Sequence, residues 1–405
     1  MAHLFAFRAL RPTASSAAAV AAVPYDVVNS EEAQALAAGN PLSFLHVSRA
    51  EIDLPTDTNP YADAVYTKAV ENFAALRQAA PLVVEDEPSV YVYRLQMGPH
   101  VQTGIAACFS VDEYDTDVIK KHERTRRDKE DDRTRHIKEL RAQTGPVFLT
   151  YKAVASVDQV VAAAQTRPAL FDLTAVDGVR HTIWQATAAE TTALQTAFGT
   201  IPALYIADGH HRAASAARVR QQLKEAGEAP GERDRFLAVA FPDNQMQVLP
   251  YNRVVKDLGT HTTESLLSAL RTVLTVTEGP ATPVRKGEVA MYLAGRWYTL
   301  GLGEAPAALD AASRLDVSRL QDLVLTPLLG IGDVRSDKRI DFVGGARGTA
   351  ELEKLVDTGK HAVAFSMFPV SVDDLMVISD AGGIMPPKST WFEPKLRDGL
   401  LSHLI

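Results

Sequence analysis

The sequence predicts an α/β protein in which helices flank mixed β-sheets and the chain is divided into several lobes. A chain of 405 residues is too long to fold around a single hydrophobic core of ordinary size, so two or more lobes are expected. Hydrophobic residues make up 46% of the chain and charged residues 23%, a globular balance without the signature of disorder. Segments typical of strands and helices alternate along the chain, most clearly on both sides of residue 208.

The overall charge and composition exclude several classes of protein. The net charge of −8 argues against a general nucleic-acid binder, which needs a basic surface, but allows a local basic pocket for a small anion. The alanine-rich stretch 14–23 is weakly hydrophobic for a signal peptide, and no run reaches the ~18 apolar residues of a membrane span. The lone Cys108 lies in an apolar run and is predicted to be a buried small hydrophobe. We therefore expect a cytoplasmic protein without membrane or nucleic-acid partners.

The N-terminal part is expected to contain two helices and a hairpin. Ser30 is predicted to cap a helix that ends near residues 39–41. Apolar residues at helical spacing predict a second helix over 61–79. The strand 90–95 and a partner strand that ends at Phe109 form the predicted hairpin.

The segment 120–141 is the most polar part of the chain. Its 22 residues include ten lysines or arginines and six aspartates or glutamates, with almost no apolar position before Ile137. We predict a helix here. Because a helix this polar cannot bury a stripe of its surface, it should be exposed, line a cavity or close over a ligand.

The mixture of charges in this segment suits a polyphosphate. On a helix, Glu123 and Glu130 would share one side, while His122, Lys129 and Arg133 would lie close to another. Such an arrangement could hold phosphates with their Mg²⁺ and position a general base. The alternative interpretation is a charged face in contact with solvent.

The middle of the chain predicts a strand, a sharp turn and a helix in succession. The strand over 203–207 is apolar, and the helix expected over 212–226 is rich in small residues. After a polar loop, the next strand is expected over 236–241. This strand–helix–strand order favours a mixed or parallel sheet.

The last third repeats the alternation of strands and helices. We expect a hairpin of the strands 289–293 and 297–300, and a helical region at 317–329. A strand over 340–343 enters a glycine turn, after which Thr349 is expected to cap a short helix. A further strand precedes an irregular, polar tail.

The strongest candidate site is the turn of the middle segment, Asp208-Gly209-His210-His211-Arg212. Glycine permits a sharp backbone turn, and the free N–H groups of a helix start favour an anion. The two histidines and the arginine add three donors at the same point, so the turn is predicted to hold a phosphate. In the alternative interpretation Asp208 only caps the helix and the histidines pack against their neighbours.

A metal centre is the competing interpretation of this turn. Adjacent helical residues point about 100° apart and rarely ligate one ion together. No His-x-His or His-x-x-x-His spacing accompanies the pair. We therefore expect no tightly held metal, with Asp208 available to the Mg²⁺ that accompanies a nucleotide.

The tail of the chain is a third candidate. Lys388, Ser389, Thr390 and Lys395 could hold a carboxylate or phosphate, and Trp391 could form the wall of a pocket. The alternative is a rigid, proline-bounded clasp. Neither the phosphate-loop pattern Gly-x-x-x-x-Gly-Lys-Ser/Thr nor a kinase catalytic loop occurs in the sequence.

Several motifs follow one another in an order that identifies a family. They are Phe7–Pro12, Pro24–Val27, His122-Glu123-x-Thr125, Lys129-Glu130-x-Asp132-Arg133, Gly145–Phe148, Tyr205–Arg212, Pro250–Arg253, Asp341–Gly345 and Pro386–Lys395. With these motifs, essentially the full chain resembles domain-of-unknown-function family 1015. The central turn of that family is similar to that of the ParB- and sulfiredoxin-like free serine kinases. The resemblance implies a multi-lobed fold around a ParB/sulfiredoxin-like core of strand, turn and helix.

The resemblance also implies an activity, the transfer of a phosphoryl group from ATP, or ADP, to free L-serine with Mg²⁺. The implied nucleotide site comprises Gly209, His210, His211, Arg212, His122, Thr125, Lys129 and Arg133. The implied substrate site comprises Lys388, Ser389, Thr390, Trp391 and Arg253. An acidic residue would take the proton of the serine hydroxyl, and the candidates for this base are Asp26, Glu123 and Asp208.

The family pattern treats residues 1–405 as one unit with three segments. We expect an N-terminal lobe over 1–200 with the charged helix 120–141, a phosphate-binding core over 201–260 and a C-terminal lobe over 261–405. The DNA-binding modules of ParB proteins are not apparent, and a homodimer is possible in principle. Two other functions stay open: a phosphatase or nucleotide hydrolase that uses the same anion site, and a ParB-like nucleotide switch with little transfer activity.

Overall fold

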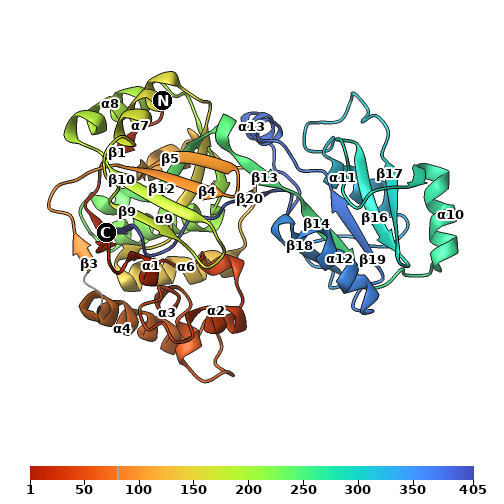
Figure 1. Ribbon diagram of the computed structural model, residues 1–405, viewed down its shortest axis with the longest axis horizontal. Coiled ribbons are helices and arrows are strands. Elements are labelled where there is room, and N and C mark those ends of the chain that lie inside the picture. The colour runs from red at the N-terminus through yellow and green to blue at the C-terminus, as the bar shows by residue number, and fades with distance from the viewer. Residues whose placement is uncertain (80–81) are drawn as a thin grey trace. The chain divides into compact units, whose positions relative to one another are not determined.

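The computed structural model describes residues 1–79 and 82–405, which divide into two compact units (Figure 1). Unit 1 comprises Met1–Met246 together with Pro394–Ile405, and unit 2 comprises Gln247–Glu393. Each unit contains its own sheets and flanking helices, which confirms the mixed α/β, multi-lobed class expected from the sequence. The turn at Asp208 lies in unit 1, with the final residues of the chain.

The main sheet of unit 1 has nine strands in the order β6-β11-β8-β12-β5-β4-β10-β9, with β1 paired to β5. The strands are β1 (Leu4–Phe5), β4 (Tyr91–Met97), β5 (His100–Ser110), β6 (Ile119–Lys120), β8 (Val147–Tyr151), β9 (Phe171–Thr174), β10 (Arg180–Gln185), β11 (Leu204–Asp208) and β12 (Arg235–Pro242). The sheet is mixed, because β8 runs parallel to β12 and antiparallel to β11. The antiparallel pairing of β4 with β5 confirms the predicted hairpin.

A second sheet brings the end of the chain back to unit 1. Its order is β3-β2-β21-β7. The strands are β2 (Ala9–Pro12), β3 (Leu82–Val84), β7 (Ala142–Gln143) and β21 (Ser402–Leu404). Because β21 lies between β2 and β7, the last residues are fixed to the same unit as the turn at Asp208.

The helices of unit 1 cover two sides of the nine-stranded sheet. Figure 1 shows α7 and α8 together on one side, and α6 with the N-terminal helices α1 to α4 on the other. The helical elements are α1 (Ala17–Val20), η1 (Tyr25–Val27), α2 (Ser30–Ala37), α3 (Leu45–Ser48), η2 (Ala50–Asp53), α4 (Asp63–Ala79), α5 (Val111–Asp115), α6 (Arg127–Leu140), α7 (Ala155–Ala164), α8 (Ala188–Phe198), α9 (His210–Glu225), η3 (Glu232–Asp234) and η4 (Asp243–Gln245).

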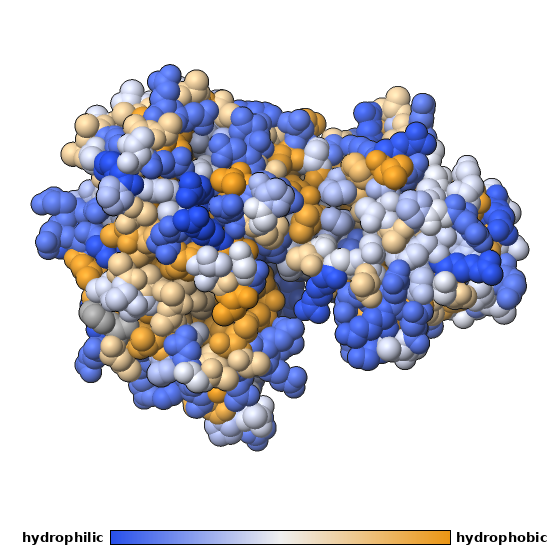
Figure 2. All heavy atoms as spheres, viewed as in Figure 1, coloured by the Kyte–Doolittle hydropathy of each residue, from blue (hydrophilic) through white to orange (hydrophobic). Residues whose placement is uncertain are grey.

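Unit 1 contains two main hydrophobic cores. The larger one joins the nine-stranded sheet to α7, α8 and the inner face of α9, and the second one joins α1 to α4 with β2. Figure 2 shows hydrophobic atoms gathered over the region of these N-terminal helices, where partly buried apolar side chains pack against the second core. Over the described parts of the chain, no helix has both the length and the apolar character to cross a membrane.

The apolar sequence of β5 follows from its position inside the nine-stranded sheet, between β12 and β4, where most of its residues are buried. Gly104 lies where a Cβ atom would be 2.7 Å from the carbonyl oxygen of Ala240, so only glycine allows the close approach to β12. Cys108 on the same strand is fully buried, and burial raises the pKa of its thiol well above the ordinary value. This confirms that Cys108 is a core residue and not a reactive thiol.

Three predicted helix starts were wrong by a few residues. The helix α2 is capped by Asn29 and not by Ser30, because Asn29 Oδ1 accepts a hydrogen bond from the Glu32 backbone at 2.8 Å and Glu32 Oε2 accepts one from the Asn29 backbone at 3.0 Å. The helix α4 begins at Asp63 and not at residue 61. The helix α9 begins at His210 and not at residue 212, so His210 and His211 both belong to the first helical turn of α9.

The helix predicted over 120–141 is shorter than expected. It begins at Arg127, because Ile119–Lys120 pairs with β11 as an edge strand and residues 121–126 cross from this strand to the helix. The helical faces expected for His122 and Glu123 were therefore wrong.

The helix α6 also buries a polar stripe, contrary to our expectation. Asp132 accepts hydrogen bonds of 2.8 Å from Tyr66 and from Arg133, and the His136 ring donates to the carbonyl oxygen of Val47 at 3.0 Å. Polar groups can be buried where they have hydrogen-bonding partners, and two of the partners here, Val47 and Tyr66, come from α3 and α4. Hydropathy alone could not reveal them.

Unit 2 is built on a six-stranded antiparallel sheet in the order β15-β17-β16-β19-β14-β18, with a separate pair β13-β20. The strands are β13 (Gln247–Leu249), β14 (Tyr251–Val255), β15 (Thr275–Glu278), β16 (Glu288–Leu293), β17 (Arg296–Gly301), β18 (Ile340–Gly344), β19 (Val363–Met367) and β20 (Trp391–Glu393). The helical elements are α10 (Thr263–Val273), α11 (Asp316–Leu320), η5 (Gln321–Leu325), η6 (Gly345–Arg347), α12 (Gly348–Asp357) and α13 (Val372–Asp380).

The sequence predicted most of these elements but not all of their ends. The pairing of β16 with β17 confirms the predicted hairpin. Thr349 does not cap α12, which begins one residue earlier after the short helical turn η6. The helical region expected to reach residue 329 ends as a π-helical turn at Leu325.

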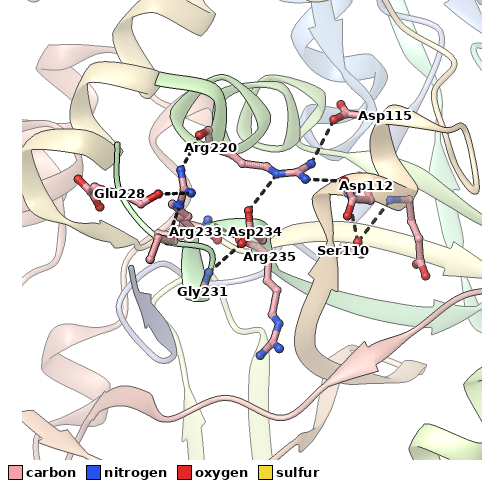
Figure 3. Close-up of polar contacts among 12 residues, drawn as sticks. Ser110, Asp112, Asp115, Arg220, Glu228, Gly231, Arg233, Asp234 and Arg235 are labelled. Atoms are coloured by element: carbon pink, nitrogen blue, oxygen red, sulfur yellow. Dashed lines mark hydrogen bonds and ion pairs between the residues drawn. The ribbon is translucent and has the colours of Figure 1, made fainter. Parts of the chain in front are cut away.

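One arginine fastens the far end of α9 to its surroundings (Figure 3). Arg220 donates to Asp234 at 3.0 Å and forms ion pairs with Asp112 and Asp115 of α5, so one guanidinium joins three segments of unit 1. Asp234 also accepts a hydrogen bond from the Gly231 backbone at 2.8 Å, which closes the polar loop before β12. Since the Arg220 side chain is about four-fifths buried, the network is more than a surface ion pair.

Replacing Arg220 with methionine is expected to lower the free energy of unfolding by about 1–2 kcal/mol, because three carboxylates lose a shared partner. The measurement is chemical denaturation followed by circular dichroism. The matched control is Arg271→Met on the exposed face of α10, which should change the stability by less than about 0.5 kcal/mol. Equal stability of the two variants would contradict a structural role for the network.

Candidate functional site

The site begins where β11 ends and the chain turns into α9. Gly209 has φ of +88°, in the left-handed region that glycine adopts without strain. Its backbone N–H donates to Asp208 Oδ1 at 2.9 Å. A Cβ atom at this position would lie 3.1 Å from Arg212 Cζ. Both the backbone angle and the packed guanidinium therefore require glycine.

Replacing Gly209 with alanine is expected to lower the free energy of unfolding by about 1–3 kcal/mol, because the alanine would be strained in the left-handed region and its Cβ atom would press on Arg212. Gly227, at the other end of α9, is a matched control with φ of +85°, where an added Cβ atom would meet no other atom within 4 Å. The Gly227→Ala variant carries the backbone strain alone, so it should lose less stability in thermal melting. Equal losses would show that the contact with Arg212 has no energetic weight.

Arg212 forms the centre of a buried charge cluster. Its side chain is 7% exposed, its Nη1 donates to the carbonyl oxygen of Pro146, and its Nη2 lies 3.3 Å from Asp26 Oδ2 and 3.7 Å from Asp208 Oδ2. Burial opposes the charge of Arg212, but the surrounding carboxylates outweigh it and raise the pKa of the guanidinium. The arginine is thus a permanent cation held within the unit.

Asp208 lies between two cations. Its Oδ2 is 3.0 Å from Lys395 Nζ, which the C-terminal segment brings to the turn. Burial works to raise the pKa of Asp208, but Lys395 and Arg212 outweigh it and hold the pKa well below the ordinary range. Asp208 is therefore ionised at neutral pH, with its side chain 30% exposed.

The two histidines of the turn hold the segment 122–126 against α9. The Nε2 atom of His210 accepts a hydrogen bond from the His122 backbone at 3.4 Å, and that of His211 accepts one from the Arg126 backbone at 3.0 Å. The rings of His122 and His210 pack edge to face at 4.4 Å. Burial lowers the pKa of His122 to about 4 and that of His210 well below its ordinary value, so both rings are neutral at pH 7.

The other nucleotide-site residues expected from the sequence lie along α6 and the segment that precedes it. Thr125 donates to Glu130, and Lys129 Nζ donates to the hydroxyl of Tyr61 at 2.7 Å. Arg133 donates to Asp132 at 2.8 Å and stacks over the ring of Tyr25 with its Cζ 4.2 Å from the ring centroid.

Two neighbouring cavities share Arg133 and Tyr25 in their walls, and the smaller one also reaches the turn through Arg212. The smaller one, about 30 Å³, is lined by Arg133, Arg212 and Asp398 among others. The larger one, about 150 Å³, reaches Lys129 and Asp132. The structure thus brings Arg133 and Arg212 to one cavity and places Lys129 at the next.

The five residues of the expected substrate site belong to unit 2. Arg253 is buried, and its guanidinium donates to the carbonyl oxygens of Tyr251 and Lys388. Burial lowers the pKa of Arg253 to about 10. Ser389 is also buried and donates to the carbonyl oxygen of Pro386 at 2.6 Å.

The rest of the tail packs closely against the sheet of unit 2. Trp391 meets Tyr251 edge to face at 5.1 Å, and a Cβ atom at Gly344 would lie 2.9 Å from the Trp391 ring. Lys388 places its ammonium 5.2 Å from the centroid of the Tyr251 ring, and Thr390 is partly exposed. These contacts form a structural clasp, while Lys388 and Thr390 keep part of their surface accessible.

The sequence matches one family of known proteins. The family described as "Protein of unknown function (DUF1015)" matches residues 4–318. The chain belongs to this family. No curated protein matches the sequence.

Among solved structures, this DUF1015 protein resembles three at low identity. A free serine kinase in complex with AMP is 14% identical, with 73% of this chain and 91% of that chain covered and a TM-score of 0.37. SbnI with a C-terminal truncation, from Staphylococcus aureus, is 14% identical, with 74% and 87% covered and a TM-score of 0.39. A conserved hypothetical protein from Pyrococcus furiosus is 14% identical, with 74% and 95% covered and a TM-score of 0.37.

Sequence reasoning missed one member of the cluster, Asp398. It is 2% exposed and lines the smaller cavity together with Arg212. A Cβ atom at Gly145 would lie 3.1 Å from Asp398 Oδ1 and 3.4 Å from Arg212 Cδ, so both side chains pack against this glycine. The Oδ1 atom has no hydrogen-bonding partner among the described residues. The only signal in the sequence was a pair of charged residues, Arg397 and Asp398, inside the apolar run from Leu396 to Leu401.

Asp398 should make the stability of this DUF1015 protein depend on pH. Burial raises the pKa of Asp398 to about 7, although Arg212 partly opposes the shift. A carboxyl group with a raised pKa in the folded state contributes fully at low pH, and that contribution is lost as the pH rises through the folded pKa. The free energy of unfolding of the parent, measured relative to Asp398→Asn, should therefore fall by about 2–3 kcal/mol between pH 5 and pH 8. Denaturation curves of both proteins at each pH provide the test, and parallel profiles would contradict it.

Proposed function

We propose that this DUF1015 protein is a small-molecule kinase that transfers a phosphoryl group from ATP or ADP to free L-serine, giving O-phospho-L-serine. The observation that carries the proposal is the Gly209 turn, which opens α9 beside an ionised Asp208 flanked by two cations, Arg212 and Lys395. Phosphoryl transfer depends mainly on positioning the partners and on stabilising charge, and this turn offers both. The choice of serine as acceptor rests on the similarity of the central turn to that of the ParB- and sulfiredoxin-like free serine kinases.

The donor phosphates are proposed to lie over Gly209 and the first turn of α9. The N–H groups of a helix start attract anions, and Lys395 and Arg212 add positive charge beside them. His210 and His211 support this site indirectly, because their rings hold the segment 122–126 against the helix. Mg²⁺ prefers oxygen ligands and octahedral geometry, and the ionised, partly exposed carboxylate of Asp208 fits as one ligand of a nucleotide-bound ion.

We assign the base to Asp26. Asp208 is a weak proton acceptor, because its pKa lies well below the ordinary range. Asp26 is the more exposed carboxylate, and Arg212 fixes it at 3.3 Å within the same cluster. A carboxylate held this way can take the proton of a hydroxyl group that approaches the turn.

The serine carboxylate needs a cation, and unit 1 offers Arg133. Arg133 lines both cavities, and its guanidinium stacks over the ring of Tyr25. The larger cavity, about 150 Å³, can take a small polar molecule.

Phosphorus NMR on the purified protein tests this proposal. The protein is incubated with Mg²⁺, with ATP or ADP, and with each amino acid in turn. A phosphomonoester signal that appears with L-serine and is absent with L-alanine supports the proposal. Release of inorganic phosphate without an acceptor would show a nucleotide hydrolase instead. Nucleotide-dependent dimerisation without turnover would show a switch, and either result would overturn the kinase assignment.

A further inference from the structure

A group of metal-ligating side chains lies next to the turn, and no metal bound by this group takes part in the function proposed above. His122 and Glu123 precede α6, and His210 is the first residue of α9. One ligand atom from each of the three lies within 4.8 Å of the others. Ligands held ~2.0–2.2 Å from an ion are themselves separated by about 3–4 Å, so small side-chain adjustments would close the group around one ion. In this change His210 would exchange the long hydrogen bond of 3.4 Å, which its Nε2 atom accepts from the His122 backbone, for the ion.

An unpartnered nitrogen is the second observation. His122 is 2% exposed, and its Nδ1 atom is buried without a hydrogen-bonding partner among the described residues. The ring also forms a hydrogen bond to the backbone of Ile206, which leaves Nδ1 as the nitrogen with the free lone pair. A buried polar atom without a partner is costly, and an ion would provide that partner.

The hydrogen bonding around His122 matches that of known metal sites. A ligating histidine usually donates its second N–H group to a carbonyl or carboxylate, which fixes the ring and its tautomer. The backbone of Ile206, on β11, occupies that position here. The site thus joins β11, the segment before α6 and the start of α9 in one arrangement.

The chemistry of the three side chains selects the ion. Two imidazoles and one carboxylate are ligands of Zn²⁺ and related transition metals, whereas Mg²⁺ and Ca²⁺ take oxygen ligands. Three protein ligands leave one position open for water or for an oxygen of a bound molecule. The objection that adjacent histidines cannot share an ion does not apply, because His210 is paired here with His122 and not with His211.

We infer that His122, Glu123 and His210 bind one divalent transition-metal ion of the zinc class beside the first turn of α9. The ion would add positive charge where the donor phosphates are proposed to lie, and its open position can accept a phosphate oxygen. The site stands on its own residues, so it does not require the kinase assignment. Its test therefore measures metal binding and not turnover.

The experiment uses the full-length protein after dialysis against a chelator. Zn²⁺ is titrated by calorimetry, and Co²⁺ is added in parallel because its visible absorption reports a site with nitrogen and oxygen ligands. We expect one Zn²⁺ per chain and a rise in the melting temperature on binding. The variants Glu123→Gln and His210→Ala should each weaken the affinity for Zn²⁺ by about 100-fold or more.

Two controls keep the test decisive. His261→Ala, on an exposed loop of unit 2, should bind Zn²⁺ as the parent does. Glu123→Gln changes one atom type at a partly exposed position, so it remains informative even if a variant of the buried histidines fails to fold. A parent that binds less than one ion per chain would overturn the inference. Unchanged affinity in folded Glu123→Gln and His210→Ala would overturn it as well.

Discussion

Replacing Arg212 with alanine is expected to lower the free energy of unfolding by about 3–5 kcal/mol, the effect of removing one partner from a buried ion pair. The side chain is almost fully buried, and its loss leaves Asp26 and Asp208 without their shared cation. It also leaves the carbonyl oxygen of Pro146 without a donor. Chemical denaturation measures the change, and the variant should also lose the transfer activity proposed for the turn.

Arg218 provides the matched control on the same helix. It forms ion pairs with Glu130 and Asp131, but its side chain is 34% exposed. Exposed pairs contribute little, so Arg218→Ala should lower the free energy of unfolding by about 1 kcal/mol or less. If the two variants unfold at the same denaturant concentration, the buried cluster around Arg212 is not what stabilises unit 1.

The Asp26→Asn variant is expected to lower kcat for phosphoserine formation by about 10²–10⁴-fold, because the amide keeps the shape of the side chain but cannot accept the proton. KM for serine should change by only a few fold, since Asp26 is proposed to act on the hydroxyl in the transition state and not to bind the amino acid. The measurement is steady-state kinetics with serine as the varied substrate.

The control for Asp26 is Asp57→Asn, an exposed aspartate in a loop of the same unit. It should keep the rate of the parent. Thermal melting of both variants shows whether any loss of rate reflects unfolding. A folded Asp26→Asn variant that keeps kcat within about fivefold would remove Asp26 from the role of base, and the assignment would pass to Glu123 or Asp208.

The fold was predictable where apolar patterns repeat locally. The hairpin β4–β5, the hairpin β16–β17 and the strand–turn–helix at Asp208 all follow from alternating or helical spacing and from turn residues. The order of strands in each sheet was not predictable, because β8 lies between β11 and β12 through pairings that no local pattern specifies. The return of β21 to unit 1 is a long-range pairing of the same kind.

The charged segment shows why composition misleads about burial. A helix with Asp132, Thr134 and His136 on its inner side looks exposed in a hydropathy pattern, yet these residues are buried. The partners of Asp132 and His136 lie on segments far away in the sequence, at Tyr66 and Val47. Pairing between distant polar groups leaves no periodic signal in the sequence.

The candidate site was predictable in its centre but not in its composition. The glycine and the anion-binding helix start identified the Asp208 turn. The same residues could not reveal that both histidines accept backbone hydrogen bonds from segment 122–126. Nor could they show that Lys395 and Asp398 return to the turn from the end of the chain. These contacts are consequences of chain topology, which no local pattern in the sequence specifies.

Hydrogen exchange with and without ADP and Mg²⁺ tests the central claim most directly, namely that the start of α9 holds the phosphates of a nucleotide. Bound ADP should slow exchange in the peptides that cover residues 208–214 and 122–126, because these backbones surround the proposed site. Exchange in the loop 227–234, at the other end of α9, should stay unchanged. Saturating ADP that protects neither of the first two segments, or protects only a distant part of the chain, would contradict the account.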